Sequence, residues 1–493
     1  MTLLPVLVAG LAALLVLPLL GVPSQAVTPG APATAGTTSA VAARATSSSI
    51  SVRLTPRLVT LSASGGTEPT ALVAEVKPSV SGRPVVLQEQ VDGRWTTLRT
   101  ARTDAAGRVG LRLRVTERGR RVFRALVKGS RGYRAARSRT TALRTVDQDG
   151  GCKPRTPLVD PGANGEAVCL ATRIDRWRTA KVMAIGQQVN ASSQHWADPL
   201  EGIDPPVIGF DLDELHKAAT YEYPFADQVV ADLVTRAHGG AMLVASWHAD
   251  NPWTGGPYTD RRTKGGLGSL LDRSTGASKR FLADWDAQLE LLRRFAEDDA
   301  DGDGLADHAP CWCTPVVVRP LHEGNGAFSW WGKQKPAQYR KLYALLQRTA
   351  RAAGVHNLLW AYAANRDTSG VAPTPSYLPR KVDVGGLDTY DPEIGRGEAK
   401  DRLPLEGYAD LEKKVDRMAL TEVGPHGSDG RWSPSVVTQT LERRKVRPLW
   451  AMFWFDDGRP SGKGPQGVKQ LTSLKGGTSW LRRRCLGGMC PLR

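Results

Sequence analysis

Residues 314–323 read TPVVVRPLHE, a short apolar run that ends abruptly in polar residues. Helical patterns flank it on both sides, with apolar residues at intervals of three and four in 278–298 and in 336–354. A buried strand between two amphipathic helices is the repeating unit of a parallel sheet with crossover helices. The run therefore predicts a central strand of an α/β fold.

Seven further apolar runs extend this pattern in both directions. They are KVMAIGQQ (181–188), PVIGFDLD (206–213), GAMLVASWH (240–248), NLLWAYAAN (357–365), VDVGGLDTY (382–390), RMALTEVG (417–424) and RPLWAMFWF (447–455). Helical patterns such as FADQVVADLVTRAH (225–238) separate most of them. Eight strand-helix units in a chain of this length predict a (β/α)8 TIM barrel over residues 151–493.

The strand ends should carry the chemistry, because active sites of such barrels lie at the carboxyl ends of the strands. A lone glutamate there is usually a cap and a lone tryptophan usually core. Two glutamates at matching ends after apolar runs are costly to bury without a purpose. Aromatic rings stack on sugars and paired carboxyls cleave glycosidic bonds, so a carbohydrate site is expected. The strand-end residues are His248, Glu323, Asn365, Asp388, Tyr390, Glu422 and Trp454.

Glu323 and Glu422 are the candidate catalytic pair. In a retaining glycosidase two carboxyls stand about 5 to 5.5 Å apart, so one ionises as the nucleophile while the other stays protonated as the acid. Esterification of the nucleophile removes its charge, and the acid then becomes the base that activates water. This chemistry requires no cofactor.

The first 48 residues differ from the rest in composition. Residues 1–26 begin with an apolar run that predicts a signal peptide and hence a secreted protein. An uncleaved anchor is the alternative, since no Lys or Arg precedes the run. Residues 27–48 are rich in Ala, Thr, Ser, Pro and Gly and predict a linker.

The six cysteines lie in three close pairs, Cys152 with Cys169, Cys311 with Cys313 and Cys485 with Cys490. Short disulfide loops are expected from this spacing, and they agree with export to an oxidising compartment.

Residues 49–148 show short alternating strands broken by turn signals, which predict a small all-β sandwich. The rhythm loosely resembles immunoglobulin-like modules of secreted bacterial enzymes. This stretch holds 20 Lys or Arg and 7 Asp or Glu, a net charge of +13 within a whole-chain charge of +17. Such a surface would attract an anionic cell-wall polymer and keep the protein near the cell surface, while a solvated arginine-rich surface is the alternative. Nucleic acid is not the expected partner.

An acidic loop, DADGDGLAD, precedes the central strand. Asp299, Asp301, Asp303 and Asp307 occupy the first, third, fifth and ninth positions of a calcium-loop pattern. The twelfth position is Pro310 rather than Glu, so a ligand is missing or comes from elsewhere. The loop predicts either a structural calcium site or a solvated acidic turn.

Residues 319–332, RPLHEGNGAFSWWG, resemble the RPxHExNGxWFWWG motif of glycoside hydrolase family 26, the β-mannanases and related β-glycanases. Supporting stretches follow in the same order: VIGFDLDE at 207, SWHADNP at 246, VGGLDTYD at 384, ALTEVG at 419 and WAMFWFDD at 450. The resemblance covers residues 180–460 and leaves out the N-terminal module.

The resemblance implies roles for individual residues. It makes Glu323 the acid/base, Glu422 the nucleophile and Tyr390 a neighbour of the nucleophile. Arg319 would support the site from behind. The implied substrate-binding residues are Trp247, His248, His322, Asn325, Phe328, Trp331, Tyr390 and Trp454.

Two departures concern the sugar-binding walls. Phe328 stands where the family commonly has tryptophan, and Phe455 follows Trp454 where arginine is common. The expected activity is endo-β-1,4-mannanase, acting on mannan, glucomannan or galactomannan. A β-1,3-1,4-glucanase, a β-xylanase or an inactive glycan-binding wall protein are the alternatives.

Overall fold

The computed structural model describes residues 45–55, 57–61, 70–91, 93–117, 119–130, 132–147, 152–220, 225–308, 312–392, 402–457 and 467–492. The predicted signal peptide, most of the predicted linker and Cys311 lie outside these residues. No helix within the described ranges has the length and hydropathy needed to cross a membrane.

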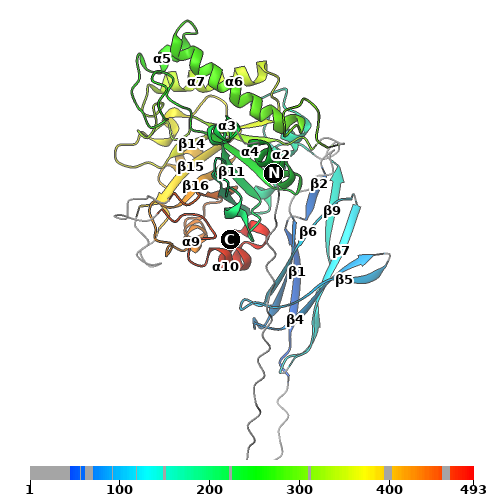
Figure 1. Ribbon diagram of the computed structural model, residues 1–493. Helices are drawn as coiled ribbons and strands as arrows, with labels where there is room; N and C mark the ends of the chain where they lie inside the picture. Colours follow the sequence, from blue (N-terminus) through cyan, green and yellow to red (C-terminus); the bar gives the residue numbers. More distant parts are fainter. Residues whose placement is uncertain are drawn as a thin grey trace, which may run out of the picture. The chain divides into compact units, whose positions relative to one another are not determined.

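The N-terminal strands form two sheets that share one core (Figure 1). The first sheet has the order β1 (Ser49–Thr55), β3 (Thr70–Lys77) and β6 (Arg108–Leu113). The second has the order β2 (Leu58–Leu61), β9 (Thr141–Asp147), β7 (Gly119–Val127), β4 (Pro84–Val91) and β5 (Arg94–Arg102), and β8 (Ala136–Arg137) pairs with β7. Alternate apolar residues of both sheets, such as Leu72, Leu87 and Phe123, are buried between them, as the period of a strand requires.

Eight parallel strands then close into a barrel, which confirms the predicted (β/α)8 fold. The ring closes because β10 pairs with β17 on one side and with β11 on the other. The strands are β10 (Val182–Gln188), β11 (Val207–Asp211), β12 (Met242–Trp247), β13 (Val316–Pro320), β14 (Leu358–Asn365), β15 (Val384–Asp391), β16 (Met418–Pro425) and β17 (Trp450–Phe453).

Helices follow the barrel strands, and Figure 1 shows several of them around the outside. They are α3 (Leu212–Thr220), α4 (Phe225–His238), α5 (Gly266–Leu271), α6 (Gly276–Glu297), α7 (Pro336–Ala352), α8 (Tyr408–Glu412), α9 (Ser435–Arg444) and α10 (Gly477–Arg484). Helix α6 begins where the Thr275 side chain accepts a hydrogen bond from the Ser278 amide, and it ends at Asp298 in the left-handed conformation.

The barrel interior is a separate apolar cluster from the shell beneath the helices. Val244, Val317 and Leu359 belong to the interior cluster, and helix α2 (Gly165–Thr179) packs on it through Leu170 and Ile174. Because apolar side chains fill the barrel interior, the reactive site is expected at the carboxyl ends of the strands, where active sites of such barrels lie.

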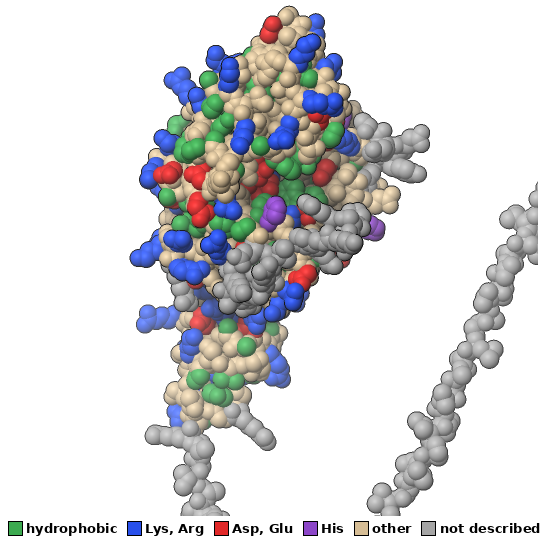
Figure 2. All heavy atoms as spheres, turned by 90° about the vertical axis from the view of Figure 1, so that its left-hand side faces the viewer, with side chains coloured by type: hydrophobic (Ala, Val, Ile, Leu, Met, Phe, Trp, Pro, Cys, Tyr) green, Lys and Arg blue, Asp and Glu red, His purple; other side chains and the backbone are tan. Residues whose placement is uncertain are grey.

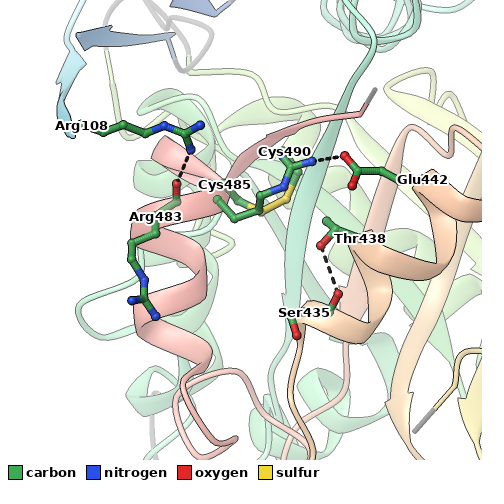
Figure 3. Close-up of a disulfide and its surroundings, with 8 residues drawn as sticks. Arg108, Ser435, Thr438, Glu442, Arg483, Cys485 and Cys490 are labelled. Atoms are coloured by element: carbon green, nitrogen blue, oxygen red, sulfur yellow. Dashed lines mark hydrogen bonds and ion pairs between the residues drawn. A yellow bond between two sulfur atoms is a disulfide. The ribbon is translucent and has the colours of Figure 1, made fainter. Parts of the chain in front are cut away.

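Two of the three predicted disulfides are formed among the described residues. Cys152 is bonded to Cys169 of α2, and Cys485 is bonded to Cys490 in β18 (Met489–Pro491). Figure 3 shows the second bond at the end of α10. The disulfide links the end of α10 to β18, which pairs antiparallel with the first barrel strand, β10.

Candidate active site

A cleft of about 860 Å³ lies at the carboxyl ends of the barrel strands, and Glu323 and Glu422 are both in its wall. Figure 2 shows the hollow, in which acidic side chains lie beside hydrophobic ones. Other residues of the wall are Asp211, Asp213, Glu214, Lys217, His248, Tyr258, His322, Phe328, Asn365, Tyr390, His426, Trp454, Phe455, Asp457 and Lys469.

Glu422 is held by a donor at each carboxylate oxygen. Arg319 Nη2 donates to Glu422 Oε1, and Tyr390 Oη donates to Oε2 at 2.7 Å. Arg319 and Glu422 are buried, and Tyr390 is partly buried. A buried carboxylate with a guanidinium and a hydroxyl directed at it is stabilised in its charged form.

Glu323 lies opposite Glu422, and its surroundings are different. Oxygens of Glu323, Asp388 and Glu422 all lie within 4.8 Å of one another. Burial raises the pKa of Glu323 well above its ordinary value, and the negative charges of Glu422 and Asp388 raise it further. Burial and these charges therefore favour the protonated form of Glu323 near neutral pH.

The backbone at Glu323 is in the left-handed region, with φ +56°. Its amide donates to Ala363 O at 2.8 Å on the neighbouring β14, and its carbonyl accepts from the Gly326 amide. Non-glycine residues rarely adopt this conformation, and they do so where the surroundings impose it. Here the tight turn after β13 directs the side chain into the cleft.

Asp388 is the third acidic group of the cluster and it is paired from both sides. Arg319 Nη1 donates to Asp388 Oδ2 at 3.2 Å, and Thr421 Oγ1 donates to Oδ1 at 2.6 Å. Arg319 thus bridges Asp388 and Glu422, and its pKa is raised because both carboxylates favour its charged form despite burial. Arg319 contacts Glu422 directly and is not among the described residues that line the cleft, as expected of a residue that supports the site from behind.

An irregularity in β16 sets the position of Glu422. Leu387 is opposite Leu420 but Asp388 is opposite Glu422, so Thr421 is an extra residue in the ladder. Gly386 makes room for it, since a Cβ there would lie 2.3 Å from Thr421 Oγ1. Bulges of this kind redirect side chains beside active sites.

A line of hydrogen bonds runs from β11 into the cleft. Asp211 Oδ2 lies 2.8 Å from His248 Nδ1, and His248 Nε2 lies 3.1 Å from His322 Nε2. Burial by itself would raise the pKa of Asp211, but the charge and hydrogen bonds of His248 lower it. Burial and the charge of Arg319 lower the pKa of His322, so this ring is neutral. Asp211 can therefore determine which ring nitrogens carry protons along the line.

Five of the eight predicted substrate-binding residues line the cleft: His248, His322, Phe328, Tyr390 and Trp454. Phe328 is 50% exposed, so its ring is available to a ligand.

The other three predicted substrate-binding residues do not line the cleft, which corrects the expectation. Trp247 is buried against Phe281 and Trp285 on the helical side of the barrel. Asn325 is fully buried and donates to the carbonyl oxygens of Asn365 and Ala372. Trp331 is also buried, and its Nε1 donates to His322 O at 2.7 Å. These side chains support the cleft from behind.

Several residues of the wall were not singled out from the sequence. Asp211 closes the second strand, so the strand-end rule applied to every strand would have found it. Glu214, Tyr258 and Lys469 come from a helix and from loops. Glu214 lies in the stretch VIGFDLDE that carries part of the family resemblance, and nothing in the local sequence marks Tyr258 or Lys469.

The acidic loop brings three of its four predicted ligands together. Oxygens of Asp299, Asp301 and Asp303 lie within 4.8 Å of one another. Asp307 is not in this group, and its Oδ2 accepts from the Ala300 amide. Pro310 lies outside the described residues. Calcium binding here stays a prediction.

Comparison with protein families gives one match that covers more than half of the chain. Residues 159–474 match the model of "Glycosyl hydrolase family 26". The matched range includes every barrel strand and both glutamates, and it excludes the N-terminal sheets.

Among individual proteins, the chain is 28% identical over 244 residues to a mannan endo-1,4-beta-mannosidase of Bacillus subtilis (strain 168), covering 46% of this chain and 59% of that protein. It is 25% identical over 315 residues to one of Thermothelomyces thermophilus, covering 61% of this chain and 57% of that protein. The chain thus spans less than two thirds of these relatives. The fold also matches the catalytic domain of a Bacillus sp. JAMB-750 GH26 endo-beta-1,4-mannanase, with a TM-score of 0.51 and 21% identity over 66% of this chain and 92% of that chain.

Proposed function

This chain belongs to glycosyl hydrolase family 26, and we propose that it is a retaining endo-β-1,4-mannanase with Glu422 as nucleophile and Glu323 as acid/base. One observation carries the proposal. Glu323 and Glu422 share a cleft with oxygens within 4.8 Å of each other, and among the described residues only Glu422 is paired with a guanidinium. An inverting enzyme would need a separation of about 6.5 to 9.5 Å to admit a water molecule.

The reaction follows from the different surroundings of the two groups. Glu422 attacks the anomeric carbon and forms a C–O bond, while the proton of Glu323 passes to the leaving glycosidic oxygen. Esterification removes the charge of Glu422, so the pKa of Glu323 falls. A water molecule then gives its proton to Glu323, its oxygen bonds to the anomeric carbon, and the bond to Glu422 breaks.

Arg319 and Tyr390 would stabilise the departing carboxylate. Both already donate to Glu422, so the charge that returns to it in the second step meets donors in position. Preorganised donors of this kind lower a barrier because nothing has to reorganise during the reaction.

The names of the relatives support mannan as the substrate. Phe328 and Trp454 offer aromatic faces in the cleft, which suit stacking on sugar rings. Neither ring selects an axial hydroxyl, so mixed-linkage glucan and xylan are the competing substrates.

Two measurements test the proposal. Proton NMR of the first product from a β-mannan oligosaccharide should show the β-anomer, and initial formation of the α-anomer would refute the retaining mechanism. Parallel product analysis on galactomannan, glucomannan, mixed-linkage glucan and xylan should give oligosaccharides from the first two. Glycan binding without released reducing ends would instead identify an inactive binding protein.

Substitution of the two glutamates completes the test. Glu323→Gln and Glu422→Ala should each lower turnover by roughly 10² to 10⁴ or more. Both variants should keep the wild-type circular dichroism spectrum, and substantial hydrolysis by either would remove the assignment.

The location and anchoring of the enzyme are also proposals. The apolar N-terminal segment and the disulfides support secretion. The charge of +13 on residues 49–148 supports retention near the cell surface by an anionic wall polymer.

A further inference from the structure

The outer side of the sheet formed by β2, β9, β7, β4 and β5 carries a group of arginines. Along β7, Phe123, Ala125 and Val127 are buried in the sandwich core, so Arg120 and Arg124 project from the other side. The same alternation places Arg144 of β9 outward, between buried Leu143 and Thr145. We call the set Gln88, Trp95, Arg120, Arg124, Arg137 and Arg144 the arginine face.

The arginine face holds like charges next to one another. Arg120 and Arg144 are direct cross-strand partners. Arg137 is opposite Leu126, two residues along β7 from Arg124. Like charges directly opposite each other, as at Arg120 and Arg144, destabilise a sheet, and an anion bound between them would reduce this repulsion.

Arg124 is fixed in place although it has no acidic partner. Its Nε donates to Gln88 Oε1 at 2.8 Å, and its guanidinium lies 4.0 Å from the centre of the Trp95 ring. Within the described residues no acceptor is recorded for its two Nη atoms. Partial desolvation and the positive charge of Arg137 lower the pKa of Arg124.

Among the residues that the structure describes, the neighbouring residue on the other side of β7 is paired, in contrast to Arg120 and Arg124. Arg121, which points the other way, binds Glu89 through Nε at 2.5 Å and Nη2 at 2.8 Å. No ion pair joins any of the four face arginines to a carboxylate in the part of the chain that the structure describes. The sandwich therefore neutralises the inward guanidinium and leaves the outward ones open.

We propose that the arginine face binds a linear cell-wall polymer that carries an anionic group, a carboxylate or a phosphate, on each repeat. A guanidinium presents parallel donors that match either group. Arg120 and Arg124 are four residues apart on one strand, a distance of about 13 Å. A chain of anions therefore fits both the Arg120–Arg144 pair and the Arg124–Arg137 pair better than one small anion does. This inference rests on the anchoring role proposed above and not on hydrolysis.

Nucleic acid is the competing polyanion. Single-stranded nucleic acids bind through bases stacked on several aromatic rings. The arginine face has one indole, and the guanidinium of Arg124 already lies over it. The face therefore offers charge without a stacking platform.

The test uses the full chain and measures its retention in affinity gels. The gels contain polygalacturonate, poly(glycerol phosphate), single-stranded DNA or neutral dextran. Two variants alter the face, Arg124→Ala/Arg137→Ala and Arg120→Ala/Arg144→Ala. A matched control, Arg443→Ala/Arg447→Ala, removes the same charge from exposed barrel residues.

We expect the wild type to be retained by at least one anionic wall polymer and not by dextran. Each face variant should weaken this binding at least about tenfold, which corresponds to about 1.4 kcal/mol, and the control should change it less than twofold. Retention by polygalacturonate alone would identify carboxylate as the ligand group, and retention by poly(glycerol phosphate) alone would identify phosphate.

Other outcomes overturn the inference. If the control variant weakens polymer binding as much as the face variants do, only the net charge matters. If DNA retains the protein more strongly than the wall polymers do, the ligand of the arginine face is nucleic acid and not a wall polymer. Wild-type protein that binds neither wall polymer would remove the anchoring role itself. Hydrolysis of a soluble oligosaccharide is assayed in parallel, so that loss of anchoring is separated from failure of the glycosidase proposal.

Discussion

Tyr390 Oη donates a hydrogen bond to Glu422 Oε2 at 2.7 Å, on the side of the carboxylate opposite Arg319. Burial and the negative charge of Glu422 raise the pKa of Tyr390 well above its ordinary value, so the phenol remains a donor. The contact joins neighbouring strands β15 and β16 at the point where the bond to the sugar would form.

Tyr390→Phe tests this donor. A hydrogen bond to a charged group contributes about 1.5 to 3 kcal/mol, so kcat should fall roughly 10- to 150-fold. Steady-state kinetics on an aryl β-mannobioside measure the effect. Tyr343→Phe is a matched control, because the Tyr343 hydroxyl donates at 2.8 Å to Ala361 O away from the cleft. Similar kinetic losses in both variants would contradict the role of Tyr390.

Replacing Arg319 should affect both stability and activity. Arg319→Met leaves Asp388 and Glu422 buried without their common partner, which should cost about 3 to 5 kcal/mol of unfolding free energy in urea titrations. The folded fraction should also be inactive. Arg417→Met is the control, because buried Arg417 pairs with Asp175 outside the cleft. It should lower stability and leave the activity per folded molecule unchanged.

Glu323→Gln should change the pH dependence of stability in a defined direction. The folded-state pKa of Glu323 is raised by burial and by Glu422 and Asp388, above the ordinary value of about 4.3. The stability that its protonation contributes is complete below the unfolded pKa and is lost as pH rises through the folded one. As the pH rises from the unfolded-state pKa of Glu323 to its folded-state pKa, the unfolding free energy of the wild type should therefore fall relative to that of Glu323→Gln. Glu201 is exposed, so the control variant Glu201→Gln should show the same pH dependence of the unfolding free energy as the wild type.

The same raised pKa predicts the alkaline limb of activity. In the wild type kcat/KM should fall as pH rises through the pKa of Glu323, because the acid form is needed to protonate the leaving oxygen. An aryl substrate whose leaving group needs no protonation should show a weaker alkaline limb. If the alkaline limb is unchanged on that substrate, it reports the ionisation of a group other than Glu323.

Asp211→Asn separates proton positioning from helix capping. The side chain accepts from the Asp213 amide at 3.0 Å at the start of α3, a bond that asparagine can keep. The asparagine side chain is neutral, so it cannot place a negative charge beside His248. We expect near-normal thermal stability with kcat lowered roughly tenfold or more and a shifted acid limb. Asp160→Asn, which alters the Asp160–His356 pair outside the cleft, should leave the pH profile unchanged.

Calcium binding by the acidic loop is tested by thermal unfolding. Calcium at about 100 times its dissociation constant should add about 2.7 kcal/mol of unfolding free energy, which a chelator should remove. Asp301→Asn or Asp303→Asn should abolish the increase, and exposed Asp416→Asn should retain it. A melting temperature that does not respond to calcium in the wild type would identify the loop as a solvated acidic turn.

Much of the barrel could be predicted from the sequence because the determining signal is local. Each strand is a short apolar run, and helices such as α4 show their amphipathic period directly. The strand-end rule then located Glu323 and Glu422 on one mouth. The family resemblance does not say which way a side chain faces in this chain, so it also implied Trp247 as a substrate-binding residue, although its ring is packed under the helices.

The sequence by itself therefore determined the eight strand-helix units and the two glutamates of the mouth, because hydrophobic period and strand order are properties of neighbouring residues. The tertiary structure alone decided the electrostatics. It joined Arg319 to Asp388 and Glu422 across three strands, inserted Thr421 as a bulge, and aligned Asp211 with His248. These relationships depend on register and burial between distant segments, which no local pattern encodes.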